Sequence, residues 1–277
     1  FARAAELLHI EQSPLSRTIK ELERHLAVRL FERTTRSTRL TWAGTVFLDE
    51  VLRIFAYIDQ AKTSVKAAAT GYHGRLRIAL SDGIPPSRVS ALLAQCRKDE
   101  PEVEIRLSTV SLSHQIKGLK SDLFDVGFAK SDALGEGFIA EPVWQDPLMV
   151  AVPALHPILA HRHLPLDEVV RYPLVLCHPE ACAGFWRQLQ HVLRATDVRL
   201  NVTDRVPTLD LMMTLVGAGY GLGCATEVQI AGYCNRDVIA RPLAGRPPML
   251  TTYLLRMDAE PSEQLSRFID RVNPPDG

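Results

Sequence analysis

The sequence predicts an α/β protein in which a small helical N-terminal part is joined by one long helix to two α/β lobes. Three observations support this architecture. A short basic helix and an arginine-rich loop occupy the first forty residues. Apolar residues then recur at helical spacing along residues 42–70, and from Arg75 onward short apolar strands alternate with helices. A chain of 277 residues has room for these two or three domains.

Residues 12–26 carry the best-marked helix of the sequence. Ser13 is predicted to cap its start, and Pro14 to occupy the first helical position, where the missing N–H costs nothing. One face carries apolar residues at spacings of four, three and four, namely Leu15, Ile19, Leu22 and Leu26. We expect that stripe to face a core. The opposite face carries hydroxyls and cations, namely Ser16, Arg17, Lys20 and Arg24. Such groups suit phosphates and base edges.

A shorter helix precedes this one, and the two are joined by a tight connection at residues 10–12. Its apolar face is formed by Phe1, Ala4, Ala5 and Leu8. Two short helices joined in this way, the second basic at its start, predict a helix-turn-helix. Taken alone, the pattern fits an ordinary helical hairpin with a solvated charged face equally well.

The loop that follows favours the helix-turn-helix. Arg33, Arg36 and Arg39 lie in a run without a carboxylate. This looks like the wing of a winged helix, a small hairpin whose tip can meet the DNA backbone or minor groove. The loop therefore favours a winged helix-turn-helix over a plain helical hairpin.

The run from Phe1 to Gly44 resembles the LysR-type transcriptional regulators. The matching residues are Phe1, Arg3, Ala4, Ala5, Leu8, Gln12, Ser13, Pro14, Leu15, Ser16, Arg17, Ile19, Leu22, Glu23, Leu26, Leu30, Phe31, Arg33, Arg36, Leu40, Thr41, Ala43 and Gly44. The resemblance implies a winged helix-turn-helix in residues 1–41 that binds double-stranded promoter DNA. The residues predicted to contact DNA are Ser13, Pro14, Ser16, Arg17, Lys20, Arg33, Thr34 and Arg36. Members of the family carry a further helix before the position of Phe1, so we expect this chain to be N-terminally truncated.

Composition bounds the class of protein. Lys plus Arg number 32 and Asp plus Glu number 32, so net charge says nothing about nucleic acid, although the segment through Arg39 is enriched in arginine. We find no apolar run long enough to span a membrane and no signal peptide. Five cysteines, an odd number without CxxC spacing, favour a reduced cytoplasm over a disulfide scaffold. We therefore expect a cytoplasmic protein with no membrane partner.

Thr41 is predicted to cap a long linker helix over residues 42–70. Apolar residues follow a three-four spacing along it, namely Leu48, Val51, Phe55, Ile58, Val65 and Ala69. Because a small neighbouring domain offers such a helix little to pack on, we expect the stripe to pair with a second copy of the chain. Packing on its own domain is the alternative. The resemblance implies the family's dimerising helix and homodimers that pair into homotetramers. Residues 71–74, which contain two glycines, predict a hinge.

Residues 75–277 are predicted to form the two α/β lobes. Lobe I comprises about residues 75–146 and 250–277, and lobe II about residues 147–249. The strand–helix rhythm of lobe I predicts a mostly parallel sheet with helices on both faces. Predicted strands are 76–80, 103–107, 125–129, 148–153, 174–177, 220–224 and 252–255, and the main predicted helices are 86–100, 185–195, 209–218 and 262–272.

Two such lobes joined by crossing strands look like the periplasmic-binding-type effector domain of the LysR-type regulators. The phrases that support this resemblance are Asp125-Val126-Gly127, Val150-Ala151-Val152-Pro153, His156-Pro157 and Val216-Gly217-Ala218-Gly219-Tyr220-Gly221. Many family members carry proline where Thr226 stands, so we expect a different cleft wall there.

A ligand site is predicted beyond the carboxyl ends of the strands, where open α/β sheets collect ligands. The candidate residues follow strands, precede helices or supply apolar walls: Ser81, Asp82, Gly83, Ser111, Phe128, Phe185 and Thr208. Free N–H groups at helix starts favour an anion, and we expect a small organic anion such as a carboxylate. The resemblance implies a small co-inducer between the lobes, which in the catabolic-operon branch is often an aromatic acid. The alternative is that Ser81 and Thr208 only cap helices. Asp82 would repel an anion unless it turned away.

Other function classes are less well supported. Ser81, His114 and Asp125 could be drawn as a triad, but no Gly-x-Ser-x-Gly elbow accompanies them, so no catalytic residue is predicted. The histidines at 156, 161 and 163 are interrupted by a proline, and we predict no metal site and no cofactor. A solute-binding protein would need an export signal and no helix-turn-helix.

Thiol-based redox sensing within the same family is a further alternative. It rests on Cys177, at the end of an apolar strand, and on Cys182, in a loop rich in small residues. Some members of the family sense oxidants through paired thiols in the second lobe. A buried cysteine after an apolar strand is more often an inert core residue.

Overall fold

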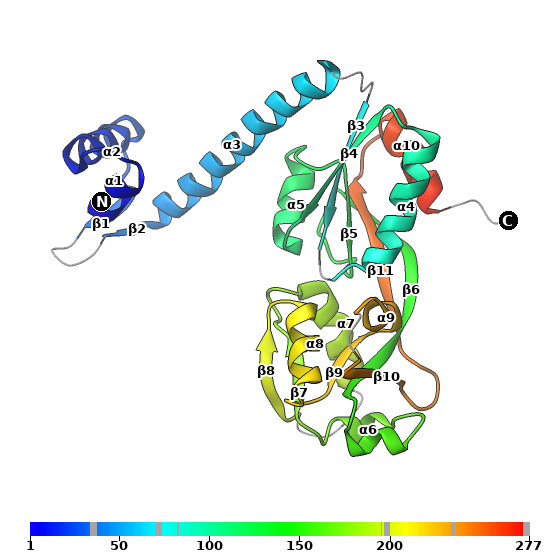
Figure 1. Ribbon diagram of the computed structural model, residues 1–277. Coiled ribbons are helices and arrows are strands. Elements are labelled where there is room, and N and C mark those ends of the chain that lie inside the picture. Colours follow the sequence, from blue (N-terminus) through cyan, green and yellow to red (C-terminus); the bar gives the residue numbers. More distant parts are fainter. Residues whose placement is uncertain are drawn as a thin grey trace. The chain divides into compact units, whose positions relative to one another are not determined.

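The computed structural model describes residues 1–33, 38–69, 74–81, 83–194, 196, 200–233 and 236–273, and it leaves the side chains of Ala2, Arg33 and several residues between 53 and 69 undescribed. The chain divides into two compact units, residues Phe1–Ala69 and Thr70–Gly277 (Figure 1). The predicted hinge residues 71–73 lie outside the described residues, and Gly74 is already the first residue of a strand.

The first unit contains α1 (Ala2–Leu7), α2 (Gln12–Leu26), the hairpin strands β1 (Phe31–Arg33) and β2 (Thr38–Leu40), and the long helix α3 (Trp42–Ala69). β1 and β2 pair antiparallel, with Phe31 opposite Leu40. Two short helices followed by this hairpin confirm the winged helix-turn-helix. The tip of the wing, residues 34–37, lies outside the described residues.

The prediction that Ser13 caps α2 was wrong. The helix begins two residues earlier, with Glu11 in an extended conformation at the N-cap position and without a side-chain cap there. Pro14 then stands at the third helical position. Its missing N–H is still one of the donors that a first helical turn leaves unpaired, so the earlier start loses no hydrogen bond. The spacing of apolar residues is the same for a helix that begins after Glu11 and for one that begins after Ser13, so it could not distinguish them.

The apolar stripe of α2 is only half-buried, and none of the described residues of this helix is fully buried. Ala5 of α1 is buried, and the ring of Phe1 contacts that of Phe31 edge-on at 5.5 Å between centroids. A carboxylate also ties α2 to the hairpin, because Glu23 Oε1 accepts hydrogen bonds from the backbone N–H of Leu30 (2.8 Å) and of Phe31 (3.0 Å). Polar contacts thus hold this unit together alongside a small apolar core.

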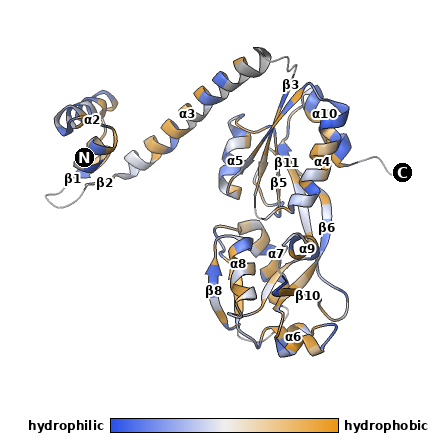
Figure 2. Cartoon of the chain, in the orientation of Figure 1, coloured by the Kyte–Doolittle hydropathy of each residue, from blue (hydrophilic) through white to orange (hydrophobic). Residues whose placement is uncertain are grey.

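The cap predicted for α3 is confirmed. Thr41 Oγ1 accepts a hydrogen bond from Gly44 N at 2.9 Å and donates one to the carbonyl of Arg29 at 2.7 Å. Large apolar side chains stay exposed along this helix, namely Trp42, Val46, Leu48, Leu52, Ile54, Phe55, Tyr57, Ile58 and Val65. Figure 2 shows hydrophobic residues recurring along α3 among hydrophilic ones. Among the described residues, no helix has the length and apolarity to cross a membrane.

Lobe I is built on a mixed sheet. β3 (Gly74–Leu80) pairs in parallel with β4 (Val103–Thr109) and β5 (Val126–Ala129), whereas β11 (Met249–Met257) runs antiparallel to both β5 and β6 (Phe138–Pro153). The predicted, mostly parallel sheet was therefore only partly right. β6 and β11 carry the chain to the second lobe and back, and strands that go and return must run in opposite directions.

Helices cover both faces of this sheet (Figure 1). α4 (Pro86–Asp99) and α10 (Glu263–Val272) pack on one face over Leu76 and Ile78, and α5 (Leu112–Lys120) packs on the other over Ala79. Successive side chains of a strand point to opposite faces of the sheet, so Ile78 and its neighbour Ala79 lie in different cores.

Lobe II forms around the second half of β6. That half pairs antiparallel with β10 (Val238–Pro242) and β9 (Gly223–Thr226), while β7 (Leu174–Cys177) lies parallel to β8 (Val202–Val206). Its helices are α6 (Leu166–Val169), α7 (Ala183–Leu193), α8 (Leu209–Gly217), α9 (Glu227–Gly232) and a 3-10 turn at Pro157–Ala160. Hydrophobic residues are plentiful in this lobe, whereas β8 and the distant helix α10 are largely hydrophilic (Figure 2).

Candidate functional site: a cavity between the lobes

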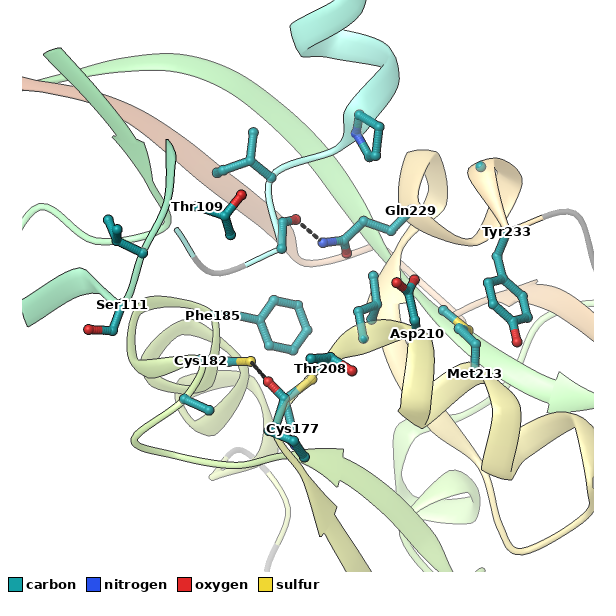
Figure 3. Close-up of a pocket in the computed structure, with 18 of the residues that line it drawn as sticks. Thr109, Ser111, Cys177, Cys182, Phe185, Thr208, Asp210, Met213, Gln229 and Tyr233 are labelled. Atoms are coloured by element: carbon teal, nitrogen blue, oxygen red, sulfur yellow. Dashed lines mark hydrogen bonds between the residues drawn. The ribbon is translucent and has the colours of Figure 1, made fainter. Parts of the chain in front are cut away.

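A cavity of about 690 Å³ lies between the two lobes (Figure 3). Lobe I lines it with Gly83, Ile84, Pro86, Ser87, Thr109, Val110 and Ser111. Lobe II lines it with Cys177, Ala181, Cys182, Phe185, Pro207, Thr208, Leu209, Asp210, Met213, Gln229, Gly232 and Tyr233. This volume falls in the range of pockets that enclose a small organic molecule.

Within the described part of the chain, four helices begin at this wall. Their N-cap residues are Pro85 for α4, Ser111 for α5, Cys182 for α7 and Thr208 for α8. Because the first N–H groups of a helix point outward and its dipole is positive there, the wall favours negative charge. No lysine, arginine or histidine side chain lies among the described lining residues.

The four helix starts differ in how their N–H groups are satisfied. Ser111 Oγ accepts from His114 N at 3.4 Å, and Thr208 Oγ1 accepts from Leu211 N at 3.3 Å. In the described residues, α4 and α7 have no such side-chain cap. Both hydroxyls therefore cap their helices, as the alternative interpretation held for Thr208, and they also line the cavity.

Four of the predicted ligand residues line this cavity: Gly83, Ser111, Phe185 and Thr208. Asp82 lies outside the described residues. The structure therefore brings together residues from both lobes that are 74 to 125 positions apart in the sequence.

Ser81 does not open onto the cavity, so its prediction as a lining residue and as the start of a helix was wrong. It is 2 % exposed, and its Oγ donates to Gln115 Oε1 at 3.0 Å, beneath α5. The helix after it begins only at Pro86. The side chain after β3 therefore turns into the interface between sheet and helix.

Phe128 is likewise a core residue and does not line the cavity. Its ring stacks on Trp144 with centroids 4.9 Å apart and meets Phe268 edge-on at 6.2 Å. At 1 % exposure it lies in the core between the sheet, α4 and α10. Its place near the end of β5 suggested a cavity wall, but the alternation of the strand points the ring to the other side.

Sequence reasoning missed several lining residues, notably Thr109, Asp210, Met213, Gln229 and Tyr233. Gln229 lies on α9, a helix that was not predicted, and joins the two lobes. Its Nε2 donates to the carbonyl of Gly83 in lobe I, while its Oε1 accepts from Thr226 N at 2.8 Å. Thr226 Oγ1 in turn accepts from Gln229 N, which completes a capping box. The threonine in place of the family's proline is what allows this box, because proline has no N–H to donate.

A second glutamine joins the lobes at the crossing strands. Gln188 of α7 donates through Nε2 to the carbonyls of Lys130 and Thr251, each at 2.8 Å, and accepts from Thr251 N at 2.8 Å. Two amide side chains, those of Gln229 and Gln188, thus bridge the lobes.

The thiols near the cavity are almost completely buried. Cys177 and Cys182 are 2 % and 7 % exposed, and Cys182 Sγ lies 3.6 Å from the carbonyl of Pro207. Burial raises the pKa of Cys224 to about 12 and also raises the pKa of Cys96. These two thiols are protonated at neutral pH, so both are poor nucleophiles.

The residues of the hypothetical triad are engaged elsewhere. Ser81 is bonded to Gln115, as described, and Asp125 Oδ2 accepts from both the backbone N–H (2.7 Å) and Nε (3.0 Å) of Arg77. His114 is exposed beside Ser111. Among the described residues, no group of three or more histidine, cysteine or acidic side chains is placed to hold a metal.

The first unit carries the residues predicted to contact DNA. Ser13, Pro14, Arg17 and Lys20 are exposed at the start of α2, and Ser16 is half-buried. Thr34, Arg36 and the side chain of Arg33 lie outside the described residues. The exposed set lies within the first three turns of one helix, which suits docking of a helix N-terminus against a groove.

Comparison with known proteins agrees with this division of the chain. Residues 69–274 match the LysR substrate binding domain, and residues 1–45 match the bacterial regulatory helix-turn-helix protein, lysR family. The chain is 31 % identical over 223 residues to the Escherichia coli K12 uncharacterized HTH-type transcriptional regulator YnfL, covering 80 % of this chain and 75 % of that protein. It is 29 % identical to the HTH-type transcriptional regulator ClcR of Pseudomonas putida, covering 81 % and 76 %.

Among solved structures, the fold is similar to that of CbnR, a LysR family transcriptional regulator. The TM-score is 0.80 at 22 % identity, with 99 % of this chain and 92 % of that chain covered. CbnR has also been solved in complex with its target DNA, and that structure matches with a TM-score of 0.73 at the same identity, covering 99 % of this chain and 93 % of that one.

Proposed function

Because the chain belongs to the LysR family of transcriptional regulators, we propose that a small organic carboxylate, bound in the cavity between the lobes, switches its activity at a promoter. This proposal rests on the four helices whose N-termini meet at one cavity in the described part of the chain. Because no cationic side chain lies in the described wall, these N-termini are the groups there that can attract an anion. Backbone N–H groups and dipoles would hold the acid, and an apolar or aromatic body would lie against Phe185.

A ligand can act as a switch only through a difference in its affinity for two conformations. A carboxylate that touched the start of α5 in lobe I and of α8 in lobe II would favour the arrangement in which both starts face one cavity. Ser111 and Thr208 are the hydroxyls best placed for those contacts, since both line the cavity and both begin a helix. Residues 71–74 would pass the change to the DNA-binding unit.

A thermal-shift screen of small aliphatic and aromatic carboxylates tests this function. A ligand at one hundred times its Kd raises the unfolding free energy by about 2.7 kcal/mol, so a hit appears without knowledge of the promoter. Ser111→Ala should weaken binding of the hit by about tenfold, because a hydrogen bond to a charged group is lost. Ser121→Ala, which alters a hydroxyl at the opposite end of α5 and outside the cavity lining, is the matched control. Equal affinities of the two variants would place the ligand elsewhere.

For DNA recognition, we propose that Ser13, Pro14, Ser16, Arg17 and Lys20 of α2 meet the major groove, and that the wing residues Arg33, Thr34 and Arg36 meet phosphates or the minor groove. Arg17→Ala should lose about 1–3 kcal/mol of binding energy and relax sequence preference at one position.

Fluorescence anisotropy tests this on a DNA site that the unaltered chain selects from a random pool. Arg36→Ala is the comparison, since loss of a phosphate contact should weaken all sequences alike and flatten the salt dependence. If both variants lose affinity without any change in sequence preference, the proposed division of roles is wrong.

For assembly, we propose that the exposed apolar residues of α3 pair with a second copy, giving dimers that pair again into tetramers. Phe55 is 60 % exposed in the middle of this helix. Phe55→Glu should dissociate the pair, because burying an unpartnered carboxylate in an apolar seam is unfavourable. Sedimentation velocity measures the mass directly. Arg24→Glu, which places a glutamate on the exposed face of α2 instead, should leave the mass unchanged. An unchanged mass for the Phe55 variant would mean that the apolar residues of α3 pack within a single chain.

We propose a cytoplasmic location, since a regulator of transcription acts where the bacterial chromosome is. Small-molecule sensing is preferred to redox sensing here. Cys177 and Cys182 are 2 % and 7 % exposed, and an oxidant reacts with an accessible thiolate.

A further inference from the structure

Asp210 is the one charged side chain among the described residues that line the cavity. We infer that it selects effectors that carry a hydrogen-bond donor, an ammonium or a hydroxyl, at the end opposite their carboxylate. This inference rests on the proposed function, because it concerns the ligand of the same cavity.

Asp210 has an ordinary structural explanation that has to be weighed first. It is the second residue of α8, and an acidic side chain in the first turn is stabilised by the positive end of the helix. That explanation accounts for a carboxylate at this position, but it does not explain why the side chain points toward the cavity. Figure 3 shows the carboxylate lying between Gln229 and Met213, on the side of α8 that faces the cavity.

The protein itself leaves the Asp210 carboxylate without a hydrogen-bond or ion-pair partner among the described residues. The nearest amide in the view, that of Gln229, is committed at both ends, to the carbonyl of Gly83 and to the N–H of Thr226. The hydroxyl of Tyr233 is paired with Thr214 Oγ1 at 3.1 Å. Asp210 is exposed, so water solvates its carboxylate until a donor on the ligand replaces that water, and a charged donor gives the stronger bond.

The other end of the cavity has the opposite character. Ser111, Cys182 and Phe185 lie away from Asp210 in Figure 3, at the starts of α5 and α7. The positive ends of these helices attract an acid. The cavity is therefore polarised along its length.

This polarity fixes both the orientation and the class of ligand. A ligand with one carboxylate would direct it toward α5 and α7, because a carboxylate near Asp210 would be repelled. Its middle would lie against the apolar side chains of Phe185 and Met213. At the far end, affinity should fall in the order ammonium, hydroxyl, methyl and carboxylate, so amino and hydroxy acids should bind more tightly than simple acids or dicarboxylates.

Calorimetric titration of the whole chain with matched probes tests this order. One series is straight-chain carboxylates of four to eight carbons that end in an amino, hydroxyl, methyl or carboxyl group. The other series carries aminomethyl, hydroxymethyl, ethyl or carboxyl groups para to the carboxylate of benzoate. Varying the length in the first series allows for the span of the cavity. In the best-fitting length, the amino acid should bind at least about tenfold more tightly than its methyl counterpart.

Substitutions at position 210 test whether Asp210 causes the preference for the amino probe. Asp210→Asn should remove the advantage of the amino probe and keep that of the hydroxyl probe, whereas Asp210→Leu should favour the methyl probe. Glu227→Gln is the matched control, since Glu227 occupies the first turn of α9 but does not line the cavity, and it should leave the order unchanged.

Three results would overturn the inference. The first is that the unaltered chain binds the methyl or dicarboxylate probes as tightly as the amino probe, and the second is that the preference survives in Asp210→Leu. Both results would leave a carboxylate-binding cavity intact, and the proposed function would stand. Absence of binding by every probe would overturn the proposed function together with this inference.

Discussion

Replacing Gly44 with alanine is expected to abolish DNA binding while leaving effector binding intact. A β-carbon at position 44 would lie 2.0 Å from the carbonyl oxygen of Leu30. That oxygen belongs to the backbone and accepts the hydrogen bond of Thr41 N at 2.9 Å, so it cannot move aside as a flexible side chain would. Overpacking against backbone should cost about 3 kcal/mol or more in a unit with few buried residues. The start of α3 would then separate from the base of the wing.

DNA binding and effector binding can be measured separately in this variant, because residues 1–69 and 70–277 form separate compact units. Fluorescence anisotropy with the selected DNA site should show no specific binding by Gly44→Ala, while calorimetry with an effector found by the screen should give the unaltered Kd. Thr45→Ala, an exposed change in the same helical turn, should alter stability by less than about 0.5 kcal/mol. Normal DNA binding by Gly44→Ala would mean that α3 can shift away from Leu30 without loss.

Removing the side chain of Gln229 is expected to have the second large effect. Gln229→Ala loses the bond to Gly83 that joins the lobes and leaves the N–H of Thr226, a fully buried residue, without its acceptor. Together these losses should lower the unfolding free energy of residues 70–277 by about 2–4 kcal/mol. Effector affinity should fall by about tenfold, because the arrangement of lobes that forms the cavity would be less populated.

Thr226→Val separates the two contributions of Gln229. Valine has the shape of threonine but lacks the hydroxyl that accepts from Gln229 N, so the helix cap is weakened while the bond to Gly83 remains. We expect a loss of about 1 kcal/mol in urea unfolding and an unchanged effector Kd. If Thr226→Val weakens effector binding as much as Gln229→Ala does, then a shift of α9, and not the loss of the bond between the lobes, causes the weaker binding.

The sequence predicted those helices and turns whose capping residues and residue spacing match the structure that the folded chain adopts. The wing followed from the run without a carboxylate that contains Arg33, Arg36 and Arg39, and the cap of α3 followed from Thr41. The start of α2 was misplaced by two residues, because both Glu11 and Ser13 can precede a helix that has Pro14 in its first turn. β8, α9 and β10 were missed since each is short and lacks a clear apolar period.

The candidate site was predictable in outline but not residue by residue. Gly83, Ser111, Phe185 and Thr208 line the cavity because each lies at the edge of a sheet where a helix begins. Ser81 meets the same description, yet it points under α5, and a sequence does not reveal which way a residue turns after its strand ends.

The lining residues that were missed come from helix faces that cannot be assigned from sequence. Gln229 and Tyr233 come from or follow the unpredicted helix α9, and Asp210 looked like an ordinary acid at a helix start. Only the three-dimensional arrangement shows that these side chains meet across one cavity.

The strand β6 constrains how the effector domain can move. Its residues Phe138–Pro147 pair with β11 and its residues Leu148–Pro153 pair with β9 and β10, so one uninterrupted strand belongs to both lobes. A change in the angle between the lobes has to bend or twist this ribbon, with the irregularity between Thr252 and Tyr253 as the weakest place in its register. We expect a bound ligand that changes this angle to strain the ribbon, and the ribbon to relax when the ligand leaves.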